Sequence, residues 1–248
     1  MRISIITATY NSASTIRDTV SSVKAQSFES VEHLIIDGGS TDGTLEILKE
    51  YQHIDRISSE PDRGIYDAMN KGIGMANGDV IGILNSDDHY AGPKVLEKVA
   101  DAFTSTEIDA VYGDLDYVDA KDTNRIVRSW RSGEYVPGAF KWGWMPPHTT
   151  FFVRKEIYER YGGFNLNMGT AADYELMLRF IHRQGIRLVY LPEVLVKMRS
   201  GGASNASLAA RLRANQNDLK AWKENDLEPY WFTLYLKPLR KIGQFLVR

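Results

Sequence analysis

The chain has 248 residues, of which 43% are hydrophobic and 25% are charged, and its formal net charge is −2. This composition is that of an ordinary globular protein, and the length favours one α/β domain over two small ones. The slight acidic excess argues against a general nucleic-acid binder, which needs basic residues to neutralise phosphates. Because there is no cysteine, disulfides and thiolate metal sites are excluded.

The apolar N-terminal stretch is too short for a signal peptide, and no later stretch is long enough to span a bilayer. We therefore expect a protein that is made and kept in the cytoplasm.

Strand-like and helix-like segments alternate along residues 1–108. Short apolar, often β-branched runs predict strands over 3–8, 31–36, 54–58 and 80–84. Apolar residues at helical spacing predict helices between and after them, over 14–23, 45–48, 65–76 and 96–103. This order predicts a mainly parallel, Rossmann-like sheet with helices on both faces.

The rhythm changes from about residue 109. Strand-like pieces cover 110–112, 126–130, 151–153 and 188–191, the last of which ends at Pro192, and a helix carries the apolar residues of 174–181. A loop rich in Gly, Pro and Trp runs over 132–147, and a final helical region starts near Ser204, whose hydroxyl could cap it. We expect a main domain over 1–205, with halves 1–108 and 109–205, and a helical, amphipathic tail over 206–248.

Polar side chains stand at the ends of four successive predicted strands. They belong to segments 9–11, 37–42, 60–64 and 85–88. Ligands of open parallel sheets bind beyond the carboxyl ends of the strands. Each segment alone could be a turn or a helix cap, but carboxylates gathered on one edge repel one another unless a cation or ligand offsets them. Such oxygens suit Mg²⁺ or Mn²⁺, whose open positions a nucleotide diphosphate can fill.

The ordered set of motifs resembles the family 2 glycosyltransferases of the GT-A fold, especially those that build bacterial surface polysaccharides. The resemblance covers roughly residues 1–205 and rests on segments 4–11, 35–44, 60–72, 84–88, 147–152 and 172–176. It implies a nucleotide-sugar half, a smaller acceptor half, and an inverting transfer of sugar to a glycan or lipid-linked glycan hydroxyl. A UDP-sugar is the favoured donor.

Three other functions compete with glycosyl transfer. A dinucleotide-dependent oxidoreductase would carry G-x-G-x-x-G after its first strand, where this chain has Ala-Thr-Tyr-Asn-Ser. A nucleotidyltransferase would want a Gly-rich basic loop at the same place. A sugar-nucleotide or glycan-binding protein with impaired catalysis is the third alternative, because one acid of the metal motif is missing.

The resemblance assigns a donor site. Thr9, Asp37 and Asp62 would hold the nucleoside, and Arg199 stands in a Gly-rich turn that either closes on the diphosphate or is a plain loop. The other residues expected to bind the nucleotide sugar are Asn11, Glu60, Gly64, Lys71, Asn85 and Ser86.

The resemblance also assigns a metal site and a base. Asn85-Ser86-Asp87 occupies the family's Asp-x-Asp position, so Asp87 would coordinate Mn²⁺ or Mg²⁺. Asn85 offers an amide oxygen without charge, and Asp88 could compensate for the missing acid. Asp173 matches the catalytic base that takes the acceptor's proton; the alternative is an acid that stabilises a helix N-terminus.

Aromatic residues mark the expected acceptor side and the tail. Trp142 and Trp144 could stack on a sugar and His148 could line the acceptor pocket, or all three could serve local packing. In the tail, aromatic and basic residues alternate, and no acid follows Glu228. This pattern suits the anionic inner leaflet of a membrane; the alternatives are packing on the catalytic domain or on a second subunit in a homodimer. The residues concerned are Tyr230, Trp231, Phe232, Leu234, Tyr235, Lys237, Leu239, Arg240, Lys241, Ile242, Phe245, Leu246, Val247 and Arg248.

Overall fold

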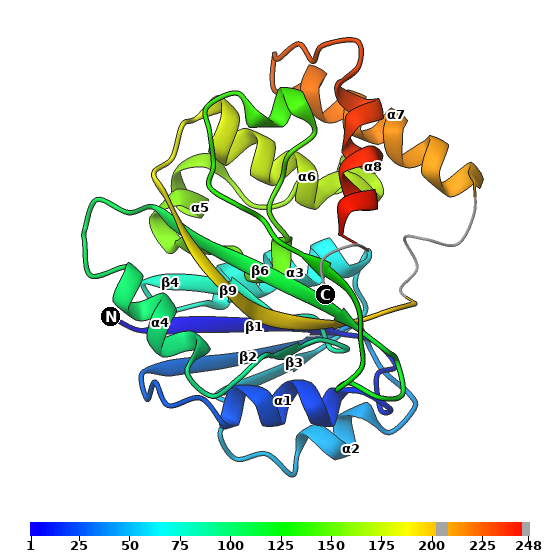
Figure 1. The fold of residues 1–248 in the computed structure, drawn as a ribbon. Coiled ribbons are helices and arrows are strands. Elements are labelled where there is room, and N and C mark those ends of the chain that lie inside the picture. The colour runs from blue at the N-terminus through cyan, green and yellow to red at the C-terminus, as the bar shows by residue number, and fades with distance from the viewer. Residues whose placement is uncertain (202–207, 245–248) are drawn as a thin grey trace.

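The computed structural model describes residues 1–201 and 208–244, and Figure 1 shows them as an α/β fold around one curved sheet. The expected helix cap at Ser204, the predicted boundary at 205 and the tail residues Phe245 to Arg248 lie outside the described residues. The elements of the first half are β1 (Ile3–Thr9), α1 (Ile16–Lys24), β2 (Val31–Asp37), α2 (Thr44–Leu48), β3 (Arg56–Ser59), α3 (Ile65–Met75), β4 (Val80–Ile83), β5 (His89–Tyr90) and α4 (Val95–Ala102).

The second half contributes strands to the same sheet and most of the helical layer. Its elements are β6 (Ala110–Val118), β7 (Ile126–Trp130), η1 (Ala139–Trp142), η2 (His148–Thr150), β8 (Phe152–Arg154), α5 (Lys155–Tyr161), η3 (Leu166–Ala171), α6 (Ala172–Met177), the π-helical η4 (Leu178–Arg183), β9 (Leu188–Arg199), α7 (Leu208–Glu224) and α8 (Thr233–Gly243). The short elements β5 and α5 were not predicted from the sequence.

The described strands form one sheet in the order β3-β2-β1-β4-β8-β6-β9-β5, with β7 paired to β6. β1 runs parallel to β2 and β4, and β2 runs parallel to β3. β8 is antiparallel to both of its neighbours, so β6 and β9 point the same way as β1. The carboxyl ends of the first four strands therefore meet at one edge, as expected for the predicted mainly parallel sheet.

Two strand predictions ended too early, because β6 continues past Tyr112 to Val118 and β9 continues past Pro192. Pro192 does not end the strand that begins at Leu188, because β9 continues to Arg199. The pairing of β6 with β9 steps from Tyr112↔Tyr190 to Asp114↔Val194, so Pro192 falls within an irregularity of the ladder. Proline is tolerated at such bulges, where its missing N–H breaks no regular pair.

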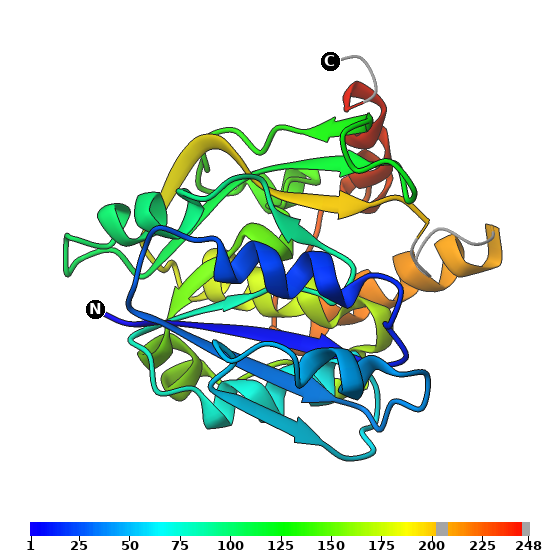
Figure 2. The same cartoon turned by 90° about the horizontal axis from the view of Figure 1, so that it is seen from below.

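Helices cover both faces of the sheet (Figures 1 and 2). Apolar residues of α3, α5 and α6 pack with one face, while those of α1, α2 and α4 pack with the other. The helix α3 lies so close to β1 that a Cβ added at Gly72 would be 2.4 Å from Ile6 Cγ2. A glycine is therefore required where this helix crosses the strand.

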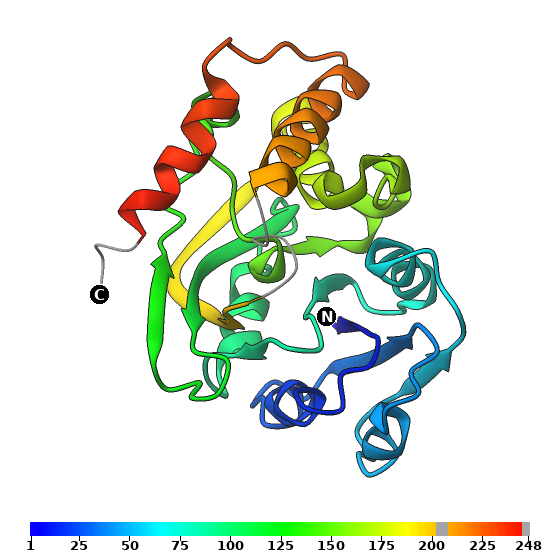
Figure 3. The same ribbon diagram turned by 90° about the vertical axis from the view of Figure 1, so that its right-hand side faces the viewer.

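The described part of the tail packs on the main domain: α7 lies beside α6, and α8 lies next to α7 and η1 (Figure 3). Trp222 of α7 is fully buried and donates from Nε1 to the Tyr174 hydroxyl at 2.8 Å. In α8, Thr233 donates to the Lys141 carbonyl at 2.7 Å, and Lys237 Nζ lies 3.8 Å from the centre of the Tyr174 ring. The described part of the tail therefore packs on the main domain, which is one of the alternatives given for it above. Within residues 1–201 and 208–244, no helix has the length and apolar character needed to cross a membrane.

A buried histidine lies within strand β2. His33 of β2 is 3.2 Å from Thr7 Oγ1 through Nε2 and 3.3 Å from His53 Nε2 through Nδ1. Burial, with the neighbouring His53, lowers the pKa of His33 to about 3. The folded protein therefore holds His33 neutral at pH values where the unfolded chain protonates it.

We expect Gly72→Ala to lower the free energy of unfolding by about 1–3 kcal/mol, because the new methyl group overpacks against Ile6. Gly74→Ala is the matched control, since nothing lies within 4 Å of its added Cβ. That control should stabilise α3 by up to about 1 kcal/mol. Urea denaturation of both variants measures the difference, and equal stabilities would contradict this packing.

We expect His33 to make the protein less stable in acid. Below about pH 6.5 the unfolded chain binds a proton at this side chain that the folded chain does not bind, so stability falls as the pH drops. Between pH 7 and pH 5 the loss from this group should be about 2 kcal/mol. Denaturation across this range should give a flatter pH dependence for His33→Gln than for the wild type; parallel curves would refute the assignment.

Candidate donor and acceptor site

Asp37 is fully buried at the end of β2 and organises the loop that follows it. Its carboxylate accepts from the backbone N–H groups of Gly39 and Ser40 at 3.1 and 2.9 Å and from the Ser59 hydroxyl at 2.6 Å. Thr9 stands opposite Asp37 in the ladder of β1 and β2. Its Oγ1 is buried without a hydrogen-bond partner among the described residues.

Asp62 lies directly over the loop after Asp37. A Cβ added at Gly38 would be 2.6 Å from Asp62 Oδ2 and 3.4 Å from Tyr10 Cδ2. The carboxylate also accepts from the Gly64 N–H at 2.8 Å. Tyr10 is 64% exposed, so an open aromatic ring and a carboxylate flank one glycine. Sequence reasoning missed Tyr10; its place directly after a buried strand was the available signal.

The remaining donor-side residues of the first half brace these loops. Asn11 adopts a φ of 49°, which asparagine tolerates, and its Oδ1 accepts from Thr41 N at 2.9 Å. Glu60 and Lys71 form an ion pair at 2.9 Å, and Lys71 also donates to the Pro61 carbonyl at 3.2 Å. Glu60 and nearby carboxylates raise the pKa of Lys71, which keeps a positive charge beside Asp62.

The turn after β4 joins this edge through its serine. The hydroxyls of Ser12 and Ser86 lie 2.8 Å apart, which connects the loops after β1 and β4. Arg199 donates to the Asp87 carbonyl oxygen at 2.7 Å and pairs with Asp18 of α1. Its guanidinium thus supports the turn that carries Asp87, with two of its nitrogens already engaged.

Adjacent acids of this turn have different environments. Asp88 is fully buried, and burial together with Asp87 raises its pKa well above the usual range. The side chain accepts from Asn85 Nδ2 at 3.2 Å, so Asp88 is a buried acid that shapes the turn. The carboxylate of Asp87 is partly exposed, and no hydrogen bond or ion pair of it is seen among the described residues.

A divalent ion is implied by the family resemblance, and the oxygens of this turn fit one. Asn85 Oδ1 is buried without a partner among the described groups, and Asp87 adds a carboxylate. No group of three acidic or histidine side chains gathers as a metal cluster within the described ranges. Mg²⁺-like ions are often held by one or two carboxylates plus substrate phosphates, so a small protein ligand set suits an ion that arrives with a diphosphate.

Asp173 faces this turn from the first turn of α6. Its Oδ2 lies 3.5 Å from His148 Nδ1, and His148 Nε2 lies 3.4 Å from Asn85 Nδ2. The Tyr66 hydroxyl, which sequence reasoning missed, also lies near Asp173; burial and this carboxylate raise the pKa of Tyr66. The structure thus brings the expected base, His148 and the metal motif into one connected group.

The two tryptophans have different surroundings. Trp144 is 7% exposed, and its Nε1 donates to the Ser132 carbonyl at 2.8 Å within the core. Trp142 is 57% exposed and contacts the rings of Tyr230 and Phe232. Trp144 therefore has the packing role that the sequence left open, and Trp142 belongs to a surface shared with the tail.

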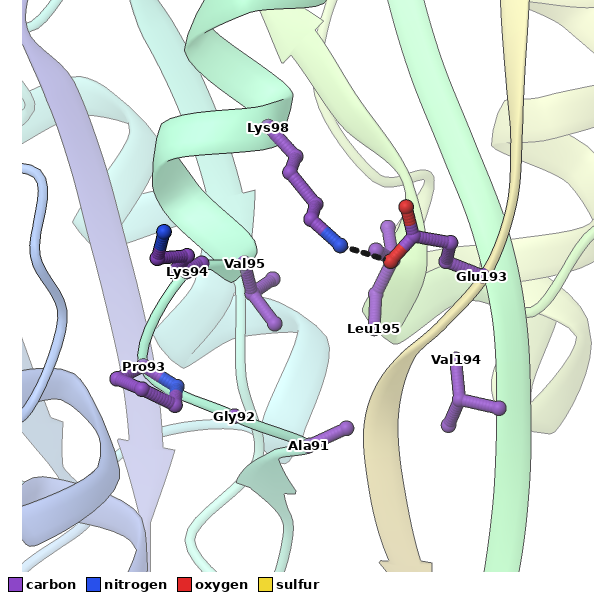
Figure 4. Close-up of a pocket in the computed structure, with 9 residues that line it drawn as sticks. All are labelled: Ala91, Gly92, Pro93, Lys94, Val95, Lys98, Glu193, Val194 and Leu195. Atoms are coloured by element: carbon purple, nitrogen blue, oxygen red, sulfur yellow. Dashed lines mark hydrogen bonds and ion pairs between the residues drawn. The ribbon is translucent and has the colours of Figure 1, made fainter.

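A separate pocket of about 340 Å³ opens between the loop before α4 and β9. An ion pair of Lys98 with Glu193 lies across it (Figure 4). None of its lining residues belongs to the predicted donor, metal or acceptor sets. The pocket is therefore separate from the donor site expected at the strand ends.

Comparison with known proteins identifies the family. The model of the family described as "Glycosyl transferase family 2" matches residues 4–166. The chain belongs to this family. An uncharacterised glycosyltransferase of Mycobacterium tuberculosis is 33% identical over 186 residues, which cover 71% of this chain and 68% of that protein. A PGL/p-HBAD biosynthesis glycosyltransferase of Mycobacterium bovis is 29% identical, with 82% and 78% covered.

Solved structures share the fold, which is GT-A as expected. Staphylococcus aureus TarS 1-349 in complex with UDP-GlcNAc has a TM-score of 0.69 at 18% identity, covering 99% of this chain and 72% of that one. The chain spans 43% of the longer TarS structure. A mannosyltransferase from Pyrobaculum calidifontis, in complex with GDP-Man and Mn²⁺, has a TM-score of 0.67 at 21% identity, covering 95% and 68%. The family decides against an oxidoreductase and a nucleotidyltransferase.

Proposed function

We propose that this glycosyltransferase transfers a sugar from a nucleoside diphosphate sugar, a UDP-sugar in the first place, to a hydroxyl of a glycan or lipid-linked glycan. The proposal includes inversion at the anomeric carbon and a place in surface polysaccharide synthesis. The observation that carries it is the connected group of Asn85, His148 and Asp173 beside the open strand ends. The UDP-GlcNAc complex of TarS supports the donor class, and a relative named for PGL/p-HBAD biosynthesis supports a biosynthetic role.

In this proposal the nucleoside lies over the ends of β1 and β2. Asp62 would accept from the base or the ribose, and the buried Thr9 hydroxyl would meet the same ligand. The exposed ring of Tyr10 could cover the base, since it flanks Gly38 together with Asp62. Asp37 would act mainly by holding the loop in shape, because its oxygens already accept hydrogen bonds from that loop.

Asp87 and Asn85 would hold Mn²⁺ or Mg²⁺ together with the diphosphate. The bound ion would supply charge that stabilises the departing diphosphate. Arg199 would act indirectly, because it donates a hydrogen bond to the backbone carbonyl of Asp87 and so supports the turn that would hold the ion.

Asp173 would act as the general base. As the acceptor oxygen forms a bond to the anomeric carbon, its proton passes to the Asp173 carboxylate. The bond from that carbon to the diphosphate breaks, and its electron pair leaves with the diphosphate oxygen. Attack opposite the leaving group inverts the carbon, and no second carboxylate is needed.

Asp173→Asn should lower kcat for transfer by about 100-fold or more, because the amide cannot take the proton. Thermal stabilisation by UDP- and GDP-sugars with Mn²⁺ should identify the donor and should persist in this variant. Asp226→Asn is the control, since Asp226 is an exposed partner of Arg183. Full transfer activity in Asp173→Asn would exclude this base, and absence of any donor stabilisation of the wild type would favour a binding protein with another ligand.

The exposed surface of the tail suits contact with a membrane. Trp231, Tyr235 and Leu239 follow one another at intervals of four residues, and the first two are 85% and 64% exposed. Arg240 is exposed beside them, and Lys141 lies over the Tyr230 ring. Aromatic and basic side chains on one surface suit the interface of an anionic bilayer. We therefore propose that this face rests on the inner leaflet, where a lipid-linked acceptor would lie.

The double variant Trp231→Ser, Tyr235→Ser should bind vesicles containing phosphatidylglycerol at least about tenfold more weakly, because two exposed aromatic anchors are lost. Leu219→Ser, at an exposed apolar residue of α7, is the control and should bind as the wild type does. Vesicle co-sedimentation measures both. Unchanged binding of the double variant would contradict a membrane role, and a change only in oligomeric state would assign the face to a homodimer.

A further inference from the structure

The proposed base is held by two side chains from other parts of the fold. His148 lies in η2, after the loop of 132–147, and its Nδ1 is 3.5 Å from Asp173 Oδ2. Tyr66 comes from α3, and its hydroxyl lies near the same carboxylate; burial, together with the charge of that carboxylate, raises the pKa of Tyr66. The other oxygen, Oδ1, accepts from the Tyr174 N–H at 2.8 Å. The rotamer of Asp173 is thus set by groups on η2, α3 and α6.

The other ring nitrogen of His148, Nε2, also has a neighbour. Its Nε2 lies 3.4 Å from Asn85 Nδ2, and the same amide nitrogen donates to Asp88 Oδ2 at 3.2 Å. An amide nitrogen carries two hydrogens, so it can donate to both neighbours, which a carboxylate at position 85 could not do. Because Nε2 then accepts from Asn85, Nδ1 carries the ring proton and points it at Asp173.

From these contacts we infer that His148 is a positioning residue, which receives its orientation from Asn85 and fixes the carboxylate of Asp173 for proton transfer. This assigns a use to the asparagine that stands in place of the first acid of the metal motif. It also gives His148 a different role from that of an acceptor contact. The inference rests on the proposed function, since it takes Asp173 as the base.

Replacing His148 with asparagine or with glutamine tests the roles of its two ring nitrogens separately. The amide group of asparagine reaches about as far as Nδ1 of histidine, while that of glutamine reaches about as far as Nε2. His148→Asn therefore keeps a donor for Asp173, and His148→Gln keeps a polar group only for Asn85. Tyr66→Phe removes the hydroxyl near Asp173 and leaves the ring contact with Phe164 in place.

The test compares kcat and the KM values of donor and acceptor for these variants and for Asp173→Asn. We expect His148→Gln and Tyr66→Phe to lower kcat at least about tenfold, His148→Asn to retain most of it, and the donor KM to stay within about twofold. Equal kcat losses in His148→Asn and His148→Gln would overturn the role of Nδ1. A raised acceptor KM with unchanged kcat would instead make His148 an acceptor contact and also overturn it.

Melting temperatures of the variants keep the result interpretable. If His148→Gln does not fold, His148→Ala against His148→Asn still decides, because the inference requires the first, which has no donor for Asp173, to lose kcat and the second to keep it. Failure of the base assignment is separate: Asp173→Asn would then keep transfer activity whatever the His148 variants do. A loss of kcat in Asp173→Asn together with full kcat in His148→Gln would overturn the inference about His148 and leave the base assignment intact.

Discussion

The parallel pairing of β1 with β2 and β4 is the constraint on which the site depends. This register sets Thr9 beside Asp37 and brings the turn after β4 to the same edge. Buried apolar strands pack between two helical layers, so the strands cannot slip without moving their apolar side chains out of the core. The polar groups of the loops are held near one another by the same burial that stabilises the fold, and their mutual contacts then refine the arrangement.

Strand ends and buried helices could be read from the sequence because they follow local periodicity. The expected positions of Asp37, Asp62 and Asn85 at one edge follow from strand order, whereas Asp173 was assigned by the family resemblance. The contacts of these residues agree with that arrangement. Their roles in binding and catalysis remain predictions.

Features that depend on non-local packing could not be predicted. Trp142 and Trp144 lie two residues apart in an irregular loop, where no period tells the exposed ring from the buried one. The adjacent acids Asp87 and Asp88 differ because the turn points only one of them into the protein. Tyr66 is separated from Asp173 by more than a hundred residues, and only the fold brings them together.

We propose that the strand ends of β1, β2 and β4 form a nucleoside diphosphate site. Calorimetric titration of Gly38→Ala with UDP and GDP in the presence of Mn²⁺ tests it most directly, because the new Cβ would lie 2.6 Å from Asp62 Oδ2. We expect Gly38→Ala to bind the nucleotide at least about tenfold more weakly than the wild type, which corresponds to about 1.4 kcal/mol. Gly92→Ala, whose added Cβ meets nothing within 4 Å, should bind like the wild type. Equal nucleotide affinity in the two variants would contradict the account.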